Sequence, residues 1–144
     1  MSSGFAEGDY IMDRIDTWLL ESYSLHGICE VEKGDIVLDC GTYSGNTTLY
    51  FANKTGSTGH VYGFEPHPEI FTRYSKNVAQ LKNCTQIRAA IAATSGTVCF
   101  SNEITPGSHI VKNGIEVQSL SLNDFICWNK VNIPPAKAGG FDNS

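Results

Sequence analysis

The sequence predicts an α/β fold built around a small parallel sheet. Segments typical of strands and of helices alternate between residues 34 and 92, and this alternation is the pattern of parallel strands joined by helical crossovers. The first strand-like segment holds an unbroken apolar run from Ile36 to Leu38 between turn residues, as expected of a strand buried on both faces. With 144 residues, the chain has the length of one domain.

A leading amphipathic helix is predicted over residues 8–25, because apolar side chains recur there at helical spacing. The first strand follows and ends near Asp39. A short helix then starts at Asn46 or Thr47, either of which suits an N-cap, and it ends before Gly56.

The second strand lies in the segment GHVYGFEP and closes at Glu65. A second helix follows, with Pro68 suited to its first turn and Glu69 to its positive N-terminal end. Residues 85–92 are predicted to form the third strand. Strands and helices of this order place the ends of the first two strands at one edge of the sheet.

The pattern changes after the third strand. Two alternating segments, 95–103 and 114–122, predict a pair of antiparallel strands joined by a surface loop. One or two helical turns, capped near Ser121 or Asn123, are expected next. Residues 134–144 contain Pro, Gly and small side chains without periodicity, so we expect a disordered tail there.

Composition narrows the classes of function. The formal net charge is −5, from 10 Lys and Arg against 15 Asp and Glu, and without a basic run nucleic acid is not an expected partner. No apolar segment approaches the roughly 20 residues of a membrane-spanning helix, so a cytoplasmic protein without a membrane partner is expected. The five cysteines are widely spaced and form no Cys-x-x-Cys pair. We expect them to be reduced, mostly buried and free of metal.

A candidate ligand loop follows the first strand. Asp39, Gly41 and Gly45 form the pattern Asp-x-Gly-x-x-x-Gly, in which glycine lets a ligand approach the backbone closely. Thr42 and Tyr43 occupy positions where a dinucleotide loop would need another glycine. Asp39 would also repel a pyrophosphate, whereas it would attract an ammonium or sulfonium group. The loop therefore favours S-adenosyl-L-methionine over NAD.

A second acid supports a nucleoside ligand. Glu65 lies at the end of the second strand, where its carboxylate would accept hydrogen bonds from both ribose hydroxyls of an adenosyl group. Glu65 alone does not separate NAD from the methyl donor, since both carry ribose. His67 would either approach the adenine or ribose or belong to a solvated turn. Ser108 and His109 are neighbours without a partner acid, so a hydrolase pair is not expected.

The segments GDIVLDCGTYSGNTTLYFA, GHVYGFEPHPEIFTRYSKNV, IRAAIAATSGTVCF and IEVQSLSLNDF resemble successive blocks of the FkbM-type, class I S-adenosylmethionine-dependent methyltransferases. The resemblance runs from about Gly34 to about Phe125. It implies a Rossmann-like sheet, a methyl donor bound by the loop and by Glu65, and O-methylation of a saccharide or another small hydroxylated acceptor. No acid follows the third strand, so adenine would depend on backbone groups and apolar contacts at Ala89 or Ala90.

The resemblance also implies a missing part. The family continues into a fourth strand ending in Asp-x-Glu-Gly, which the sequence lacks. We therefore expect an incomplete domain over residues 1–133, with its core at 34–133, and self-association through the uncovered edge of the first strand. A catalytically silent fragment that binds a nucleoside or needs a partner chain is one alternative, and an NAD-binding oxidoreductase domain is a second.

Overall fold

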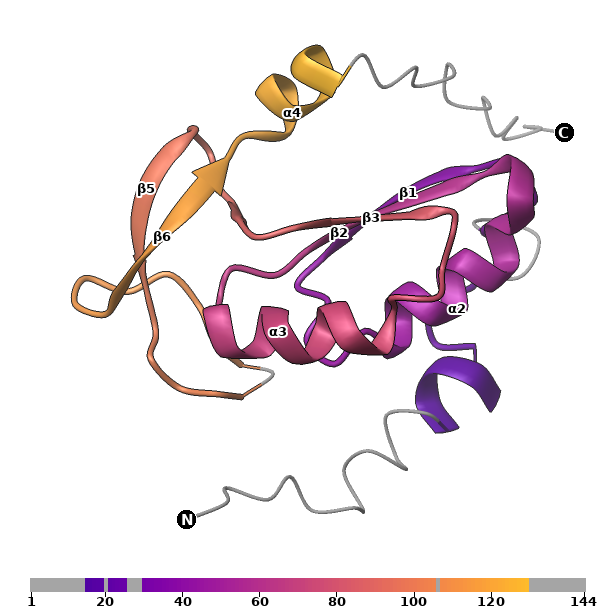
Figure 1. Cartoon of the computed structure of the whole chain (residues 1–144), viewed down its shortest axis with the longest axis horizontal. Helices are drawn as coiled ribbons and strands as arrows, with labels where there is room; N and C mark the ends of the chain where they lie inside the picture. The colour runs from indigo at the N-terminus through magenta and orange to yellow at the C-terminus, as the bar shows by residue number, and fades with distance from the viewer. Residues whose placement is uncertain (1–14, 20, 26–29, 106, 130–144) are drawn as a thin grey trace, which may run out of the picture.

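The computed structural model describes residues 15–19, 21–25, 30–105 and 107–129. Two three-stranded sheets make up this part of the chain (Figure 1). The first sheet has the order β1-β2-β3 and is parallel throughout. Helices connect its strands in sequence, as the α/β prediction required. The elements are β1 (Ile36–Cys40), α2 (Asn46–Thr55), β2 (His60–Phe64), α3 (Pro68–Asn77) and β3 (Cys84–Ile87).

The first sheet is covered on both faces. On one face, Tyr50, Phe51 and Ala52 of α2 pack with Val61 of β2 and partly buried Val37 of β1. α3 covers the same face (Figure 1). On the other face, Phe125 packs against Phe64, with partly buried apolar side chains around them: Leu38, Tyr62, Ile87, Ile91, Leu120 and Ile126. Alternate residues of each strand therefore serve two separate clusters, as expected for a buried parallel sheet.

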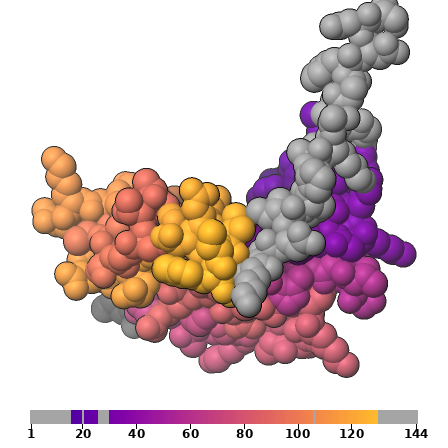
Figure 2. All heavy atoms as spheres, turned by 90° about the horizontal axis from the view of Figure 1, so that it is seen from above, coloured from indigo at the N-terminus to yellow at the C-terminus, as the bar shows by residue number. Residues whose placement is uncertain are grey.

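The second sheet has the order β4-β6-β5 and contains the predicted antiparallel pair. Its strands are β4 (Ala90–Ile91), β5 (Gly96–Phe100) and β6 (Ile115–Leu120). α4 (Leu122–Asn129) follows β6 and begins next to Ser121, whose Oγ accepts a hydrogen bond from the Asp124 amide. Figure 2 shows α4 at the surface beside the strands of this sheet.

The predicted third strand is wrong in one respect, because residues 85–92 do not form one continuous strand. β3 ends at Ile87, opposite Phe64, and the chain joins the second sheet at Ala90. The Glu65 amide still donates to the Ile87 carbonyl, but β2 has ended there. Without a neighbour on β2 to extend the ladder, the chain takes its next backbone partners from β6.

The predicted N-terminal helix over residues 8–25 is confirmed only in part. Residues Ile15–Leu19 form one π-helical turn. Glu21 has a left-handed φ of 47°, and both the amide and the Oγ of Ser22 donate to the Asp16 carbonyl. These bonds satisfy the helix end, so residues 21–25 are not helical. Residues 8–14, like the predicted tail at 134–144, lie outside the described residues.

Candidate functional site

Asp39 and Glu65 emerge at the same edge of the first sheet. In the β1–β2 register, Asp39 lies opposite Gly63 and Cys40 opposite Phe64, so Glu65 comes directly after the last paired residue. Because the strands are parallel, their carboxyl ends meet at this edge, which is where open α/β sheets bind ligands. The structure thus brings together the two acids that the sequence singled out.

The loop between β1 and α2 has an unusual backbone. Gly41, Tyr43 and Gly45 have φ values of 93°, 48° and 90°, and a left-handed conformation is strained for a residue such as Tyr43. The amides of Gly41 and Thr42 both donate to the Phe64 carbonyl, which holds the loop against the end of β2. The conformation is therefore maintained by the neighbouring strand.

The two glycines of the loop have different roles. A Cβ on Gly41 would meet no atom within 4 Å, so this position faces open space where a ligand can approach the backbone. A Cβ on Gly45 would lie 2.9 Å from Tyr74 Cδ2 and 2.9 Å from Val78 Cγ1. Gly45 thus lets the loop pack against α3. It is also the N-cap of α2 and caps without a side chain, so the predicted cap at Asn46 or Thr47 is wrong.

The Asp39 carboxylate accepts hydrogen bonds from two hydroxyl groups in the first turn of α2. Its Oδ2 accepts hydrogen bonds from Thr47 Oγ1 at 2.9 Å and Thr48 Oγ1 at 2.5 Å. The side chain is 8% exposed, and burial raises the pKa of the carboxyl, while the two hydroxyls oppose that rise. Both hydroxyls bind the same oxygen, so Oδ1 is the oxygen through which Asp39 would meet a ligand.

Glu65 joins the loop to the start of α3. Its Oε2 accepts a hydrogen bond from the Tyr43 amide at 3.1 Å, and its Oε1 accepts one from the His67 amide at 2.9 Å. The residue is 4% exposed. Burial raises the pKa of its carboxyl, and the two amide bonds partly offset the rise. Two backbone donors therefore fix the orientation of this carboxylate before any ligand binds.

Neither buried carboxylate forms an ion pair with a Lys or Arg in the part of the chain that the structure describes. There, the ion pair that is formed joins Lys54 to Glu21, on the α2 surface. Buried carboxylates without a cation are energetically costly. The site is consequently suited to a ligand that brings positive charge and hydroxyl donors, and unsuited to a pyrophosphate.

Two further residues of the predicted cofactor site, Thr42 and Ala90, have side chains that are buried against other parts of the protein. The Thr42 side chain packs over Gly63 and is 2% exposed, and its Oγ1 has no hydrogen-bond partner among the described residues. Ala90 is buried in β4 and packs with Phe100 and Val117 of the second sheet. Thr42 would therefore reach a ligand through its backbone, and Ala90 contributes to the core of the second sheet.

Gly63 helps to position the site, and the sequence pattern was not used to predict this role. A Cβ there would overlap the Tyr74 hydroxyl. Tyr74 is fully buried, its hydroxyl lies 3.6 Å from Cys84 Sγ, and burial raises the pKa of its phenol. A glycine inside a strand indicates such a close approach, so the signal was present in the second strand. It allows α3 to pack near the strand ends.

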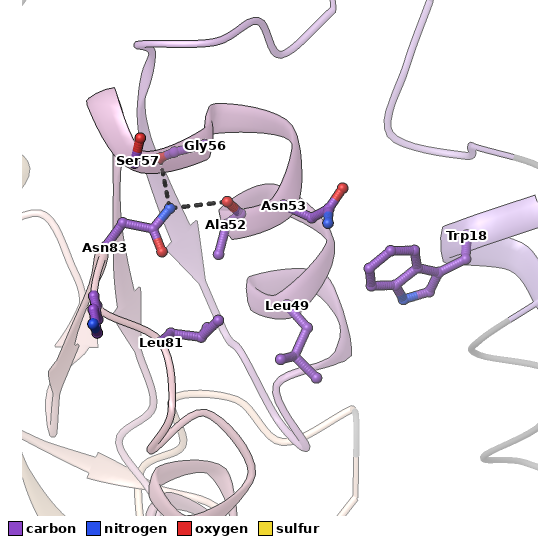
Figure 3. A pocket seen from close by; sticks show the side chains of 9 residues that line it. Trp18, Leu49, Ala52, Asn53, Gly56, Ser57, Leu81 and Asn83 are labelled. Carbon is purple, nitrogen blue, oxygen red and sulfur yellow. Dashed lines mark hydrogen bonds between the residues drawn. The ribbon is translucent and has the colours of Figure 1, made fainter.

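An open cavity of about 780 Å³ lies elsewhere, at the carboxyl-terminal end of α2 (Figure 3). Trp18, Leu49 and Asn53 are among its lining residues. The Asn83 amide at its wall donates to the carbonyls of Ala52 and Gly56, each at 2.9 Å, and so caps α2. The cavity is at the opposite end of this helix from Asp39 and contains no acid, which makes it a poor candidate for the cofactor site.

Metal chemistry finds no support within the described ranges, where no group of three or more His, Cys, Asp or Glu side chains is placed to hold an ion. The cysteines described are free; Cys40 and Cys127 are exposed and Cys84 and Cys99 are partly exposed. The expectation that cysteines are mostly buried is therefore wrong for these four. Among the helices that the structure describes, none has the length and apolarity to cross a membrane.

Comparison with known proteins identifies the family. Residues 39–135 match the model of the methyltransferase FkbM domain, about two thirds of the chain. The chain belongs to the FkbM methyltransferase family. The match begins at Asp39, the penultimate residue of β1, and includes every element from the ligand loop to α4. No curated protein sequence matches the chain.

Solved structures of methyltransferases resemble this FkbM chain more distantly. Fibrillarin of Aeropyrum pernix, with natively bound S-adenosyl-L-methionine, is 26% identical with a TM-score of 0.45 over 54% of this chain and 32% of its own. A SAM-dependent methyltransferase of Aquifex aeolicus is 20% identical, with a TM-score of 0.45 over 62% and 46%. A SAM-dependent O-methyltransferase of Thermotoga maritima is 12% identical, with a TM-score of 0.40 over 76% and 65%.

The FkbM chain thus spans less than two thirds of the length of each of these structures. Because the structural scores are low, the family match carries the assignment. It confirms the predicted family, the Rossmann-like α/β class and the cofactor, S-adenosyl-L-methionine. The residues present fit that cofactor, since one sheet edge holds an open backbone position at Gly41 and two buried carboxylates that pair with no cation from the described ranges.

Proposed function

We propose that this chain binds S-adenosyl-L-methionine at the carboxyl ends of β1 and β2, and that it serves the transfer of a methyl group to a hydroxyl of a small acceptor. The bound cofactor supplies an electrophilic methyl group on a sulfonium. Asp39 Oδ1 would attract the positively charged methionine part, and the Glu65 carboxylate would accept hydrogen bonds from the ribose hydroxyls. The backbone at Gly41 and Thr42 would lie against the ligand, with Tyr43 at the mouth of the loop.

One observation carries this proposal: Asp39 and Glu65 are buried at neighbouring strand ends without a cation from the described residues. A carboxylate in that position gains from a cationic ligand and loses from an anionic one. The negative charge of the carboxylates also argues against the NAD-binding alternative, because NAD would bring a negatively charged diphosphate towards Asp39. Two amides already orient Glu65, so ribose binding needs little reorganisation.

The acceptor class follows from the family resemblance. The resemblance to the family implies O-methylation of a small hydroxylated molecule, so we infer such an acceptor, with a saccharide as the first class to test. A cytoplasmic location fits an intracellular methyl donor. The alternative of a catalytically silent fragment differs in one measurable respect: such a chain would bind the cofactor without transferring its methyl group.

Isothermal titration with S-adenosylhomocysteine and with NAD tests the binding proposal directly. We expect the homocysteine ligand to bind and NAD to give no heat, since the latter is anionic at Asp39. Binding of NAD alone would contradict the proposal. Transfer of radiolabelled methyl to a panel of saccharides, compared with a panel of catechols and amines, then tests the acceptor class. Label incorporated into amines but not saccharides would refute that class.

A further inference from the structure

The buried imidazole of His67 follows Glu65 by two residues and has no hydrogen-bond partner among the residues that the structure describes. His67 is 2% exposed, and neither Nδ1 nor Nε2 has a hydrogen-bond partner in the part of the protein that the structure describes. Its main-chain amide donates to Glu65 Oε1 at 2.9 Å. The ring therefore belongs to a residue whose main-chain amide is hydrogen-bonded to the Glu65 carboxylate.

Burying this ring without hydrogen bonds is unfavourable. A neutral imidazole carries one N–H donor and one acceptor nitrogen, and buried polar groups in proteins nearly always have partners. Nothing about the backbone requires histidine here, because His67 has φ −73° and ψ 124° and caps α3 without a side-chain bond. An apolar side chain of similar size would serve the folded, ligand-free protein better.

We propose that the His67 imidazole is a ligand-binding group, and that one of its ring nitrogens hydrogen-bonds the nucleoside part of the cofactor held at Glu65. This inference rests on the proposed function and adds a residue to it. The missing partner is then the ligand itself, and the protein tolerates an unsatisfied ring in order to recognise it. A purine nucleoside offers both donors and acceptors, so it can satisfy either nitrogen.

The proposal predicts effects of opposite sign on stability and on binding. His67→Leu removes both unpaired nitrogens and keeps an apolar side chain of comparable size. We expect the ligand-free variant to melt at the temperature of the wild type or above it, and the Kd for S-adenosylhomocysteine to rise about 10-fold. A residue with a structural role alone would lose stability and keep its affinity.

Two amide variants and one control complete the experiment. His67→Asn places a polar atom near the position of Nδ1 and His67→Gln near that of Nε2, so one of them should recover most of the lost affinity. Ser75→Ala is the matched control, because Ser75 Oγ is also buried without a partner but lies further along α3. This control should melt at or above the wild-type temperature and bind with wild-type affinity.

The outcomes separate this inference from the proposed function. Wild-type binding with equal binding by His67→Leu would overturn the role of His67 and leave the proposed function standing. A fall in both melting temperature and affinity, unrecovered by Asn or Gln, would assign the ring a structural role and overturn the inference. Absence of binding by the wild type would overturn both. Weaker binding by Leu at undiminished stability supports the inference.

Discussion

Replacing Glu65 with glutamine should weaken both the fold and ligand binding. The two carboxylate oxygens of Glu65 accept the amides of Tyr43 and His67, at 3.1 and 2.9 Å. Glutamine has one carbonyl oxygen and one NH₂ group, so in either orientation its NH₂ faces a backbone N–H. One charge-assisted bond, worth about 1.5–3 kcal/mol, is lost. Removing a buried charge offsets part of this loss, which leaves a destabilisation of about 1–2 kcal/mol.

Thermal unfolding and calorimetric titration measure the two effects. At about 4 °C per kcal/mol for a chain of this size, the melting temperature should fall by about 4–8 °C. The Kd for S-adenosylhomocysteine should rise about 10- to 100-fold if Glu65 binds the ribose hydroxyls. Glu69→Gln is the matched control, since it removes the same charge from an exposed position in the first turn of α3. Equal melting temperatures and affinities for the two variants would refute the reasoning.

Three other perturbations test the site and its support. Gly63→Ala places a Cβ against the Tyr74 hydroxyl and 2.9 Å from Thr42 Cγ2, so the urea midpoint should drop by the equivalent of about 1–3 kcal/mol; an unchanged midpoint would deny the close approach. Burial raises the pKa of Asp39, so the native state holds that proton more tightly and the unfolding free energy should fall as pH rises from about 3.9 through the native pKa. Asp39→Asn should lessen that fall in urea titrations at about pH 4 and about pH 7, and an identical fall in both proteins would contradict the assignment. Finally, β1 pairs with β2 at one edge only among the described strands, so sedimentation should show concentration-dependent self-association that Ile36→Lys reduces, and a monodisperse monomer at every concentration would count against it.

Most of the first sheet could be predicted from local patterns. The apolar run at Ile36 to Leu38 and the turn residues around it are enough to place β1, since Val37 and Leu38 pack against apolar clusters on opposite faces of the sheet. Pro68 begins α3 as expected. The break between β3 and β4 could not be predicted, because residues 85–92 read as one strand and the change of partner at Ala90 depends on where β2 ends.

The residue types of the candidate site could be predicted from the sequence, but the hydrogen bonds and packing contacts of those residues could not. Asp39 and Glu65 are marked by their places at strand ends, and the structure brings them to one edge. The bonds of Asp39 to Thr47 and Thr48, and the packing of Gly45 against α3, depend on how a helix lies on the sheet. A sequence pattern contains no information on which way a carboxylate turns.

By itself, the sequence determined the alternation of strands and helices in the first sheet and the resemblance of its blocks to the FkbM methyltransferases. Periodicity, turn residues and motif spacing are properties of neighbouring residues. Only the tertiary structure decided which groups are buried and which have partners. Glu65 is held by amides that lie 22 residues before it and 2 residues after it in the chain, and the His67 ring is buried without any partner that the structure describes. Burial and hydrogen bonding arise where distant segments pack together, so they exist only once the chain has folded.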